Sequence, residues 1–181
     1  ESKLGGTIKK DPQPQVQASD QAFPLTDVQY SYWVGRGTDQ PMGGVDCHAY
    51  YEFEGKNVNA AKLKAAWDTV LAAHPMLHTR FTADGKQQTM PAVYPNTFSM
   101  LDLSAFAEDM QEEKLLEVRH ALSHRRFDLE FGETAGIKHC ICSGGRSVTC
   151  IDFALIVCDV QSIKIVLRDL AACYAAGKTP E

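Results

Sequence analysis

The stretch IDFALIVCDVQS, residues 151–162, contains a sharp change of pattern. Its first eight residues are apolar except for Asp152, a composition typical of a buried strand. From residue 160 onwards apolar side chains recur at the spacing of a helix, which Gly177 is predicted to end. A carboxylate directly before a helix accepts hydrogen bonds from its free backbone N–H groups. Asp159 is therefore predicted to be the N-cap of a last long helix.

Strand and helix patterns alternate through the rest of the chain. Thr26, Asn59 and Ser104 are predicted helix starts, because each is a cap-forming residue before an apolar-periodic segment. Asp-Gly at 84–85 and Gly-Gly at 144–145 are expected to turn two hairpins. The expected helices are 27–34, 60–73 and 104–122, and the expected strands are 45–53, 78–83, 86–90, 136–142 and 147–157. The predicted fold class is mixed α/β, or α+β, with a mixed sheet and helices mainly on one side of it.

Composition sets the domain organisation and excludes some partners. Residues 1–22 are polar and contain Pro12 and Pro14, so a linker or flexible tail is predicted there. The length of 181 residues suits one large domain or one lobe of a bigger protein, and residues 23–181 are expected to contain its core, because 44% of the chain is hydrophobic. The net charge is −5 without a basic block, so we expect no nucleic-acid partner. No apolar run matches a bilayer and no signal peptide is visible, so we expect no membrane partner and a cytoplasmic location.

The six cysteines are interpreted as buried, reduced thiols rather than as disulfides, a metal site or a nucleophile. If residues 144–145 form a two-residue turn, Cys150 pairs with His139 and faces away from Cys140 and Cys142. Cys158 has no neighbouring base in the sequence, so a small buried apolar role is favoured over catalysis. A histidine pair at 120 and 124 has helical i, i+4 spacing, but no further motif surrounds it and no metal is expected.

Four segments carry recognisable motifs. They are FPLTDVQYSYWVGR at 23–36, AHPMLHTRF at 73–81, SHRRFDLEFG at 123–132 and DVQSIKIVLRDLAACY at 159–174. Together they resemble the heterocyclisation domains of nonribosomal peptide synthetases, which belong to the condensation-domain superfamily. In the first motif Ser31 replaces the usual alanine, and in the second Ala73 stands where arginine is common.

The resemblance implies a fold and a place within a larger protein. Condensation-type domains have two lobes, each like chloramphenicol acetyltransferase, and their substrates meet in a tunnel between them. This chain is similar to the N-terminal lobe alone, so its partners are expected to be the C-terminal lobe and the upstream and downstream carrier proteins. Those carriers deliver phosphopantetheine arms, and no bound cofactor is implied.

The family pattern DxxxxD has one clear departure in this sequence. Asp159 matches the second aspartate, but the first position is occupied by Ala154. Amide-forming condensation domains have HHxxxDG here, and their histidine positions become Ala154 and Leu155, so that chemistry is disfavoured. Asp152 lies on the same strand face as Ala154, about 7 Å away, and could replace the missing aspartate only if the strand bulged.

Further site residues come from the resemblance. Asp159 is expected to be structural in this superfamily and to pair with the last arginine of the second motif, Arg80. A buried carboxylate needs such a partner, and Ser162 is assigned to the same structural group. Tyr32 and Trp33 are interpreted either as an aromatic tunnel wall or as core and lobe-interface packing. The remaining tunnel candidates are Arg36 and His124.

The function implied is enzymatic, within a larger siderophore or natural-product synthetase. The intact domain is expected to condense a carrier-bound acyl thioester with carrier-bound Cys, Ser or Thr and to cyclodehydrate the product to thiazoline or oxazoline. This chain alone is expected to be inactive. The alternative is a catalytically impaired lobe that serves as a carrier-docking or structural module. A simple acyltransferase of the chloramphenicol acetyltransferase type needs a catalytic histidine, and Leu155 argues against it.

Overall fold

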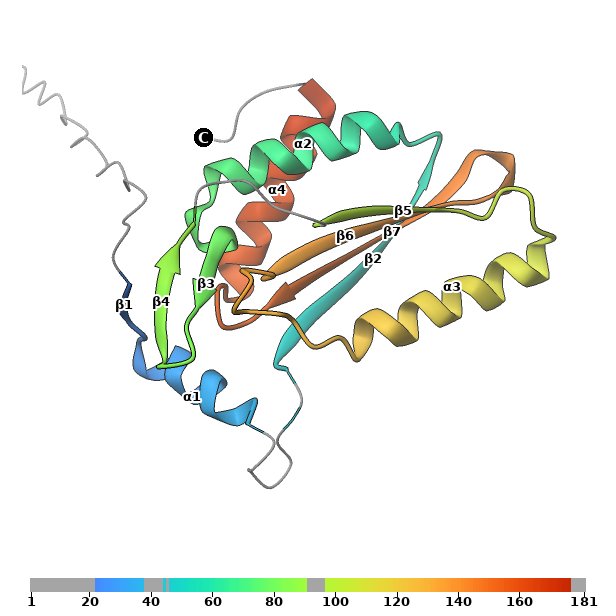
Figure 1. Ribbon diagram of the computed structural model, residues 1–181. Helices are drawn as coiled ribbons and strands as arrows, with labels where there is room; N and C mark the ends of the chain where they lie inside the picture. Colours follow the sequence, from blue (N-terminus) through green and yellow to red (C-terminus); the bar gives the residue numbers. More distant parts are fainter. Residues whose placement is uncertain (1–21, 38–43, 45, 91–96, 177–181) are drawn as a thin grey trace, which may run out of the picture.

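The computed structural model describes residues 22–37, 44, 46–90 and 97–176, so all but the last residue of the predicted tail lies outside the described residues. Two sheets form the framework (Figure 1). The smaller sheet is antiparallel, in the order β1 (Phe23–Pro24), β4 (Lys86–Thr89), β3 (Thr79–Phe81). The larger sheet has the order β2 (His48–Lys56), β7 (Arg146–Ala154), β6 (Ala135–Ile141), β5 (Phe98–Asp102). Among the strand pairs of the described residues, β5–β6 is parallel and the others are antiparallel, so the predicted mixed α/β class is confirmed.

Helices cover both faces of the larger sheet, whereas the sequence predicted them mainly on one side (Figure 1). Helices α2 (Ala60–Ala73) and α4 (Val160–Ala176) pack on one face, and α3 (Glu108–Ser123) lies on the other. The α2–α4 face holds the larger core cluster, which includes Trp67 and Phe153. The α3 face holds a smaller cluster that includes Leu115 and Cys150. Short 3₁₀ segments span Pro75–His78 and Ser143–Gly145.

The predicted caps are confirmed for three helices. Thr26 and Gln29 form a reciprocal capping box at the start of α1 (Asp27–Gly35). The Asn59 side chain accepts the Lys62 N–H at 2.9 Å before α2. Asp159 precedes α4, as the strand-to-helix change predicted. These caps satisfy local backbone donors, which is why sequence signals alone locate them.

The predicted start of α3 at Ser104 is wrong, because the helix begins at Glu108. The Ser104 N–H and hydroxyl both donate to Asp102 Oδ1, at 2.9 and 2.7 Å. A serine held by a preceding aspartate forms a turn rather than a helix cap.

The predicted register of the second hairpin is also wrong. The loop is the three-residue segment Ser143–Gly145, and the Cys142 N–H donates to the Arg146 carbonyl at 2.8 Å. Cys150 therefore pairs with Lys138 rather than with His139. The one-residue shift moves Cys150 to the same face as Cys140 and Cys142, and all three are buried in the α3-side core.

Candidate functional site

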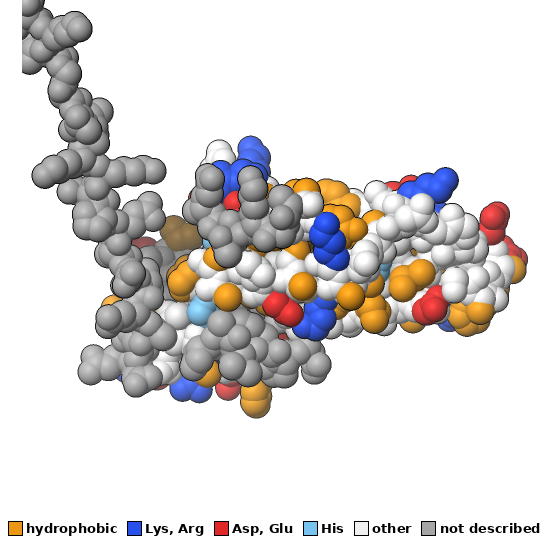
Figure 2. Space-filling model, turned by 90° about the horizontal axis from the view of Figure 1, so that it is seen from above, with side chains coloured by type: hydrophobic (Ala, Val, Ile, Leu, Met, Phe, Trp, Pro, Cys, Tyr) orange, Lys and Arg blue, Asp and Glu red, His pale blue; other side chains and the backbone are white. Residues whose placement is uncertain are grey.

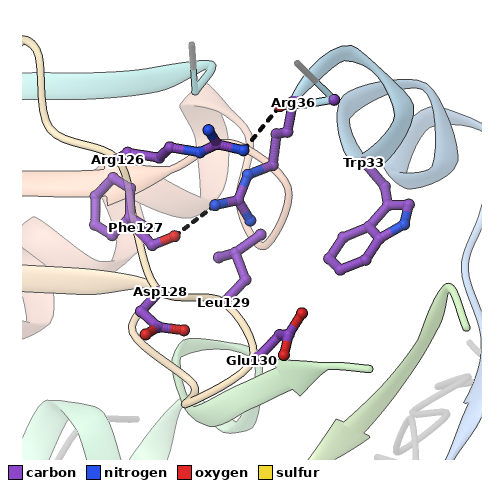
Figure 3. A pocket seen from close by; sticks show the side chains of 8 residues that line it. Trp33, Arg36, Arg126, Phe127, Asp128, Leu129 and Glu130 are labelled. Atoms are coloured by element: carbon purple, nitrogen blue, oxygen red, sulfur yellow. Dashed lines mark hydrogen bonds between the residues drawn. The ribbon is translucent and has the colours of Figure 1, made fainter. Parts of the chain in front are cut away.

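A cavity of about 470 Å³ opens between the end of α1 and the segment that follows α3 (Figure 3). Trp33 and Arg36 form the α1 wall, and residues 126–130 form the opposite wall. The Trp33 indole stacks on Phe81 of β3, with ring centroids 6.2 Å apart. Two of the predicted tunnel residues thus share one cavity.

Arg36 joins the two walls of this cavity. Its Nε donates to Asp46 Oδ1 at 2.6 Å. Its Nη2 donates to the Phe127 carbonyl at 2.5 Å, a bond that Figure 3 shows. The second Asp46 oxygen accepts the Phe127 N–H at 2.7 Å. Arg126 in turn donates to the Arg36 carbonyl at 2.8 Å. The Arg36 and Asp46 side chains are only 15% and 4% exposed, so this charge-assisted network is shielded from solvent.

Ala154 lies close to the same network. It lines a small hollow together with Tyr32, Arg36 and Asp46, with space for about one water molecule. The structure therefore brings Ala154, the residue predicted from the resemblance to replace the first aspartate of the family pattern, next to two residues of the first motif. Tyr32 is partly buried and also packs against the main core, so both interpretations of this side chain apply.

His48 is a neighbour of this site that the sequence did not single out. It pairs directly with Ala154 across β2 and β7, which places both side chains on the same face. Its ring packs edge-on against Phe127 at 6.0 Å, and its Nδ1 lies 3.2 Å from the Asp46 carbonyl oxygen. Only the register of the sheet reveals this imidazole beside position 154.

Asp152 is held in an ion pair rather than free to replace the missing aspartate. Strand β7 pairs residue by residue with β2 from His48 to Lys56, so the bulge that this replacement requires is absent from these strands. The Asp152 carboxylate accepts from Arg125 Nη1 at 2.9 and 3.2 Å, and Arg125 Nη2 donates to Glu133 at 3.1 Å. Burial raises the pKa of Asp152, and the Arg125 charge opposes that rise.

Gly136 makes room for this ion pair. A Cβ at that position would lie 3.0 Å from Arg125 Nη1 and 3.1 Å from Asp152 Oδ1. The Arg125 guanidinium also lies over the Phe127 ring, 4.5 Å from its centroid. Arg125 thus fixes the segment that forms one wall of the cavity. The sequence offered one signal for it, since a strand aspartate such as Asp152 needs a cation when buried.

The predicted Arg80–Asp159 ion pair is wrong. Asp159 is exposed, and its Oδ1 accepts the Ser162 N–H at 2.8 Å and the Ser162 hydroxyl at 2.7 Å. These hydrogen bonds from Ser162 lower the pKa of Asp159. Arg80 donates instead to Gln88 Oε1 across β3 and β4, at 2.9 and 2.7 Å. A solvated carboxylate with two local donors needs no buried cation. Ser162 is therefore the cap partner of Asp159.

His124 does not line the cavity. It is exposed at the end of α3, where its Nδ1 lies 2.9 Å from the His120 carbonyl oxygen and its ring stacks on His120 at 4.5 Å. Among the described residues, no three His, Cys, Asp or Glu side chains are grouped as metal ligands. Within the same part of the chain, no helix has the length and apolar character needed to cross a membrane.

Comparison with known proteins identifies the family. The family model "Condensation domain" matches residues 19–181. The chain is 34% identical over 163 residues to pyochelin synthetase PchE of Pseudomonas aeruginosa, covering 90% of this chain and 11% of PchE. It is 36% identical over 160 residues to phenyloxazoline synthase MbtB of Mycobacterium tuberculosis, covering 87% of this chain and 11% of MbtB.

A solved structure agrees with these sequence matches. The cyclization–docking bidomain of the EpoB nonribosomal peptide synthetase from Sorangium cellulosum superposes with a TM-score of 0.81 at 29% identity. The match covers 87% of this chain and 32% of that one, so the chain corresponds to part of each relative. The resemblance read from the four motifs is confirmed, and the chain belongs to the condensation-domain family.

Proposed function

We propose that residues 23–181 are the N-terminal lobe, like chloramphenicol acetyltransferase, of a heterocyclisation domain in a nonribosomal peptide synthetase. In this proposal the intact domain condenses a carrier-bound acyl thioester with carrier-bound Cys, Ser or Thr. It then closes the side chain onto the new amide and expels water, giving thiazoline or oxazoline. The upstream and downstream carrier proteins bring the phosphopantetheine arms, and the lobe itself needs no bound cofactor.

One observation carries the proposal. Residues from three separate motifs meet around one site: Arg36 from the first, Phe127 from the third, and Ala154 at the position where the DxxxxD pattern begins. The similarity to the EpoB cyclization domain supports the same assignment.

The chemistry explains why a lobe of this kind provides walls rather than a strong nucleophile. The aminoacyl amine attacks a thioester carbonyl that is already activated, so holding the two reactants together accounts for much of the acceleration. Water hydrolyses thioesters, so the site has to be closed by the second lobe. Two buried ion pairs, Arg36–Asp46 and Arg125–Asp152, hold the cavity wall in place. A fixed wall of this kind suits a lobe that positions substrates.

Ala154 favours a second candidate function. The first aspartate of the family pattern is missing, so the lobe can be a docking or structural module that binds carriers without catalysis. In that case the fold and the carrier surface remain, while the chemistry is lost.

The test uses the natural protein with both lobes. It is mixed with acyl-loaded donor carrier and cysteinyl-loaded acceptor carrier, and the products are followed by mass. Ala154→Asp restores the family residue, and Ala154→Asn is the matched uncharged control. Amide or dehydrated product from the natural protein supports the enzymatic proposal. Product from Ala154→Asp alone supports the module. The absence of product from all three proteins, while carriers still bind, contradicts the enzymatic assignment.

A further inference from the structure

The arginine that joins the two walls of the cavity needs a carboxylate beside it, because its charge is buried. Figure 2 shows Lys, Arg, Asp and Glu side chains at the molecular surface, where water solvates their charges. The Arg36–Asp46 pair differs, since both side chains are largely shielded from water. A buried cation that loses its counter-ion is strongly destabilising. The network between the two walls therefore depends on a carboxylate at this place, whichever strand supplies it.

Asp46 approaches Arg36 from the segment that leads into β2. One of its carboxylate oxygens accepts from Arg36 Nε at 2.6 Å, and the other accepts the Phe127 N–H at 2.7 Å. Arg36 Nη2 in turn donates to the Phe127 carbonyl. A single carboxylate thus holds the guanidinium from α1 and the backbone of the opposite wall together.

Position 154 faces the same point from strand β7. Asp46 lies two residues before His48, which is the cross-strand partner of Ala154. The Leu155 N–H donates to the Cys47 carbonyl at 3.0 Å, so the two chains stay paired beyond Ala154. Asp46 and Ala154 are therefore diagonal neighbours, and both line the small hollow that the guanidinium from α1 also lines. A carboxylate from either strand can reach this guanidinium.

The hollow has room for only one of these two carboxylates. With Asp46 in place, the remaining space holds about one water molecule. An aspartate at position 154 would add a carboxyl group and a second negative charge beside one cation. Removal of the Asp46 carboxylate would vacate the equivalent space. The two positions are thus alternatives, and this chain has its aspartate at 46 and alanine at 154.

We propose that Asp46 supplies the carboxylate that the DxxxxD pattern places at position 154. This inference rests on the proposed function, because the pattern and its first position come from that assignment. Asp46 is a positioning residue, since it acts through Arg36 to hold the wall formed by residues 126–130. In this case Ala154 does not by itself make the lobe a non-catalytic module.

The first test exchanges the two side chains in the purified chain. Asp46→Ala should lower the urea midpoint by roughly 1–2 M, because Arg36 loses its counter-ion. Ala154→Asp alone should also lower the midpoint, because two carboxylates then share one cation. The double variant Asp46→Ala with Ala154→Asp has an unchanged composition and should recover at least about half of the Asp46→Ala loss. Asp46→Ala with Ala154→Asn is the matched uncharged control and should recover clearly less.

The second test measures positioning in the natural protein with both lobes and saturating loaded carriers. Folded Asp46→Ala should reduce turnover at least about tenfold with little change in KM for the carriers, because the cavity wall is no longer held in place. The exchanged double variant should restore turnover, whereas the asparagine control should not. A purely structural carboxylate would change the urea midpoint without changing the turnover of the folded protein.

Circular dichroism checks that each variant is folded, and Asp46→Asn replaces Asp46→Ala in both tests if the alanine variant does not fold. The proposal is overturned if the exchanged variant is no more stable than the asparagine control. It is equally overturned if the folded Asp46 variant turns over as fast as the natural protein. Absence of product from the natural protein contradicts the heterocyclisation assignment instead, and the urea midpoints then decide whether Asp46 takes the place of a carboxylate at 154.

Discussion

Removal of the Arg125 guanidinium should destabilise the protein strongly, because it leaves the Asp152 carboxylate buried without its cation. The Asp152 side chain is 2% exposed, and Arg125 is its ion-pair partner in the described part of the chain. Breaking a buried ion pair from one side typically costs about 3–5 kcal/mol. Total stabilities of domains are about 5–15 kcal/mol, so Arg125→Met should remain folded but much less stable.

Urea denaturation followed by circular dichroism measures this effect. With a denaturant slope of about 2 kcal/mol/M, the midpoint should fall by roughly 1.5–2.5 M at pH 7.5. Arg119→Met is the matched control, since Arg119 is 50% exposed and pairs with Glu52 at the surface. A surface pair of this kind contributes about 0–1 kcal/mol.

The effect should depend on pH with a definite sign. Burial already raises the folded-state pKa of Asp152 above its value in the unfolded chain, and loss of Arg125 raises that pKa further. A raised folded-state pKa means that the protonated carboxyl is favoured by folding, so lower pH relieves the unpaired charge. The deficit of Arg125→Met relative to the natural chain should therefore be largest at pH 7.5 and smaller at pH 5.

Two results would refute this reasoning. One is a midpoint shift for Arg125→Met no larger than that for Arg119→Met. The other is a double variant, Arg125→Met with Asp152→Leu, that is as unstable as Arg125→Met alone, because the leucine removes the buried charge that is held responsible.

Three further predictions concern the cap, the thiols and the activity. Asp159→Ala should lower the melting temperature, while Asp159→Asn should largely preserve it, because both Asp and Asn accept the Ser162 N–H. Folding lowers the pKa of Asp159, so the charged form of the cap is favoured at neutral pH and the Asp159→Ala deficit should become smaller as pH falls through that pKa; an equal deficit at all pH values contradicts a charge-assisted cap. The prediction that all six cysteines are buried is wrong for Cys47, which is exposed, whereas the other five are buried. A thiol reagent should therefore label Cys47 rapidly and the other five only after denaturation; labelling of Cys150 in the native chain would contradict this burial. The chain by itself should give neither condensed nor dehydrated product with loaded carriers, because one lobe cannot close a tunnel; any product above a protein-free control would show otherwise.

Local interactions explain which elements were predictable from the sequence. Thr26, Asn59 and Asp159 each bond to a backbone N–H three residues ahead, so their helices could be located without knowledge of the fold. The prediction at Ser104 failed because the Ser104 N–H and hydroxyl both donate back to Asp102, so this side chain does not cap the residues that follow it. The hairpin register failed because a loop of three residues replaced the expected two.

The candidate site was harder to predict, because its contacts join distant positions. Asp152 bonds to Arg125, and several other arginines in the sequence were equally available as partners. The resemblance directed attention to Arg80 and Asp159, but Asp159 is exposed and does not need that arginine. Burial, which decides whether a carboxylate needs a cation, is a property of the assembled sheet and helices.

The ion pairs around Ala154 stabilise this lobe without any contribution from a carboxylate at position 154. The Arg36 side chain lines the hollow beside Ala154, and its positive charge is already paired with the Asp46 carboxylate. Asp152, two residues earlier, is likewise paired with Arg125. An aspartate at 154 would be a third buried carboxylate competing for these arginines, whereas alanine leaves both pairs intact. In the proposal that Ala154 replaces the first family aspartate, this replacement therefore needs no compensating change in the fold, and the lobe keeps its motifs and cavity without that carboxylate.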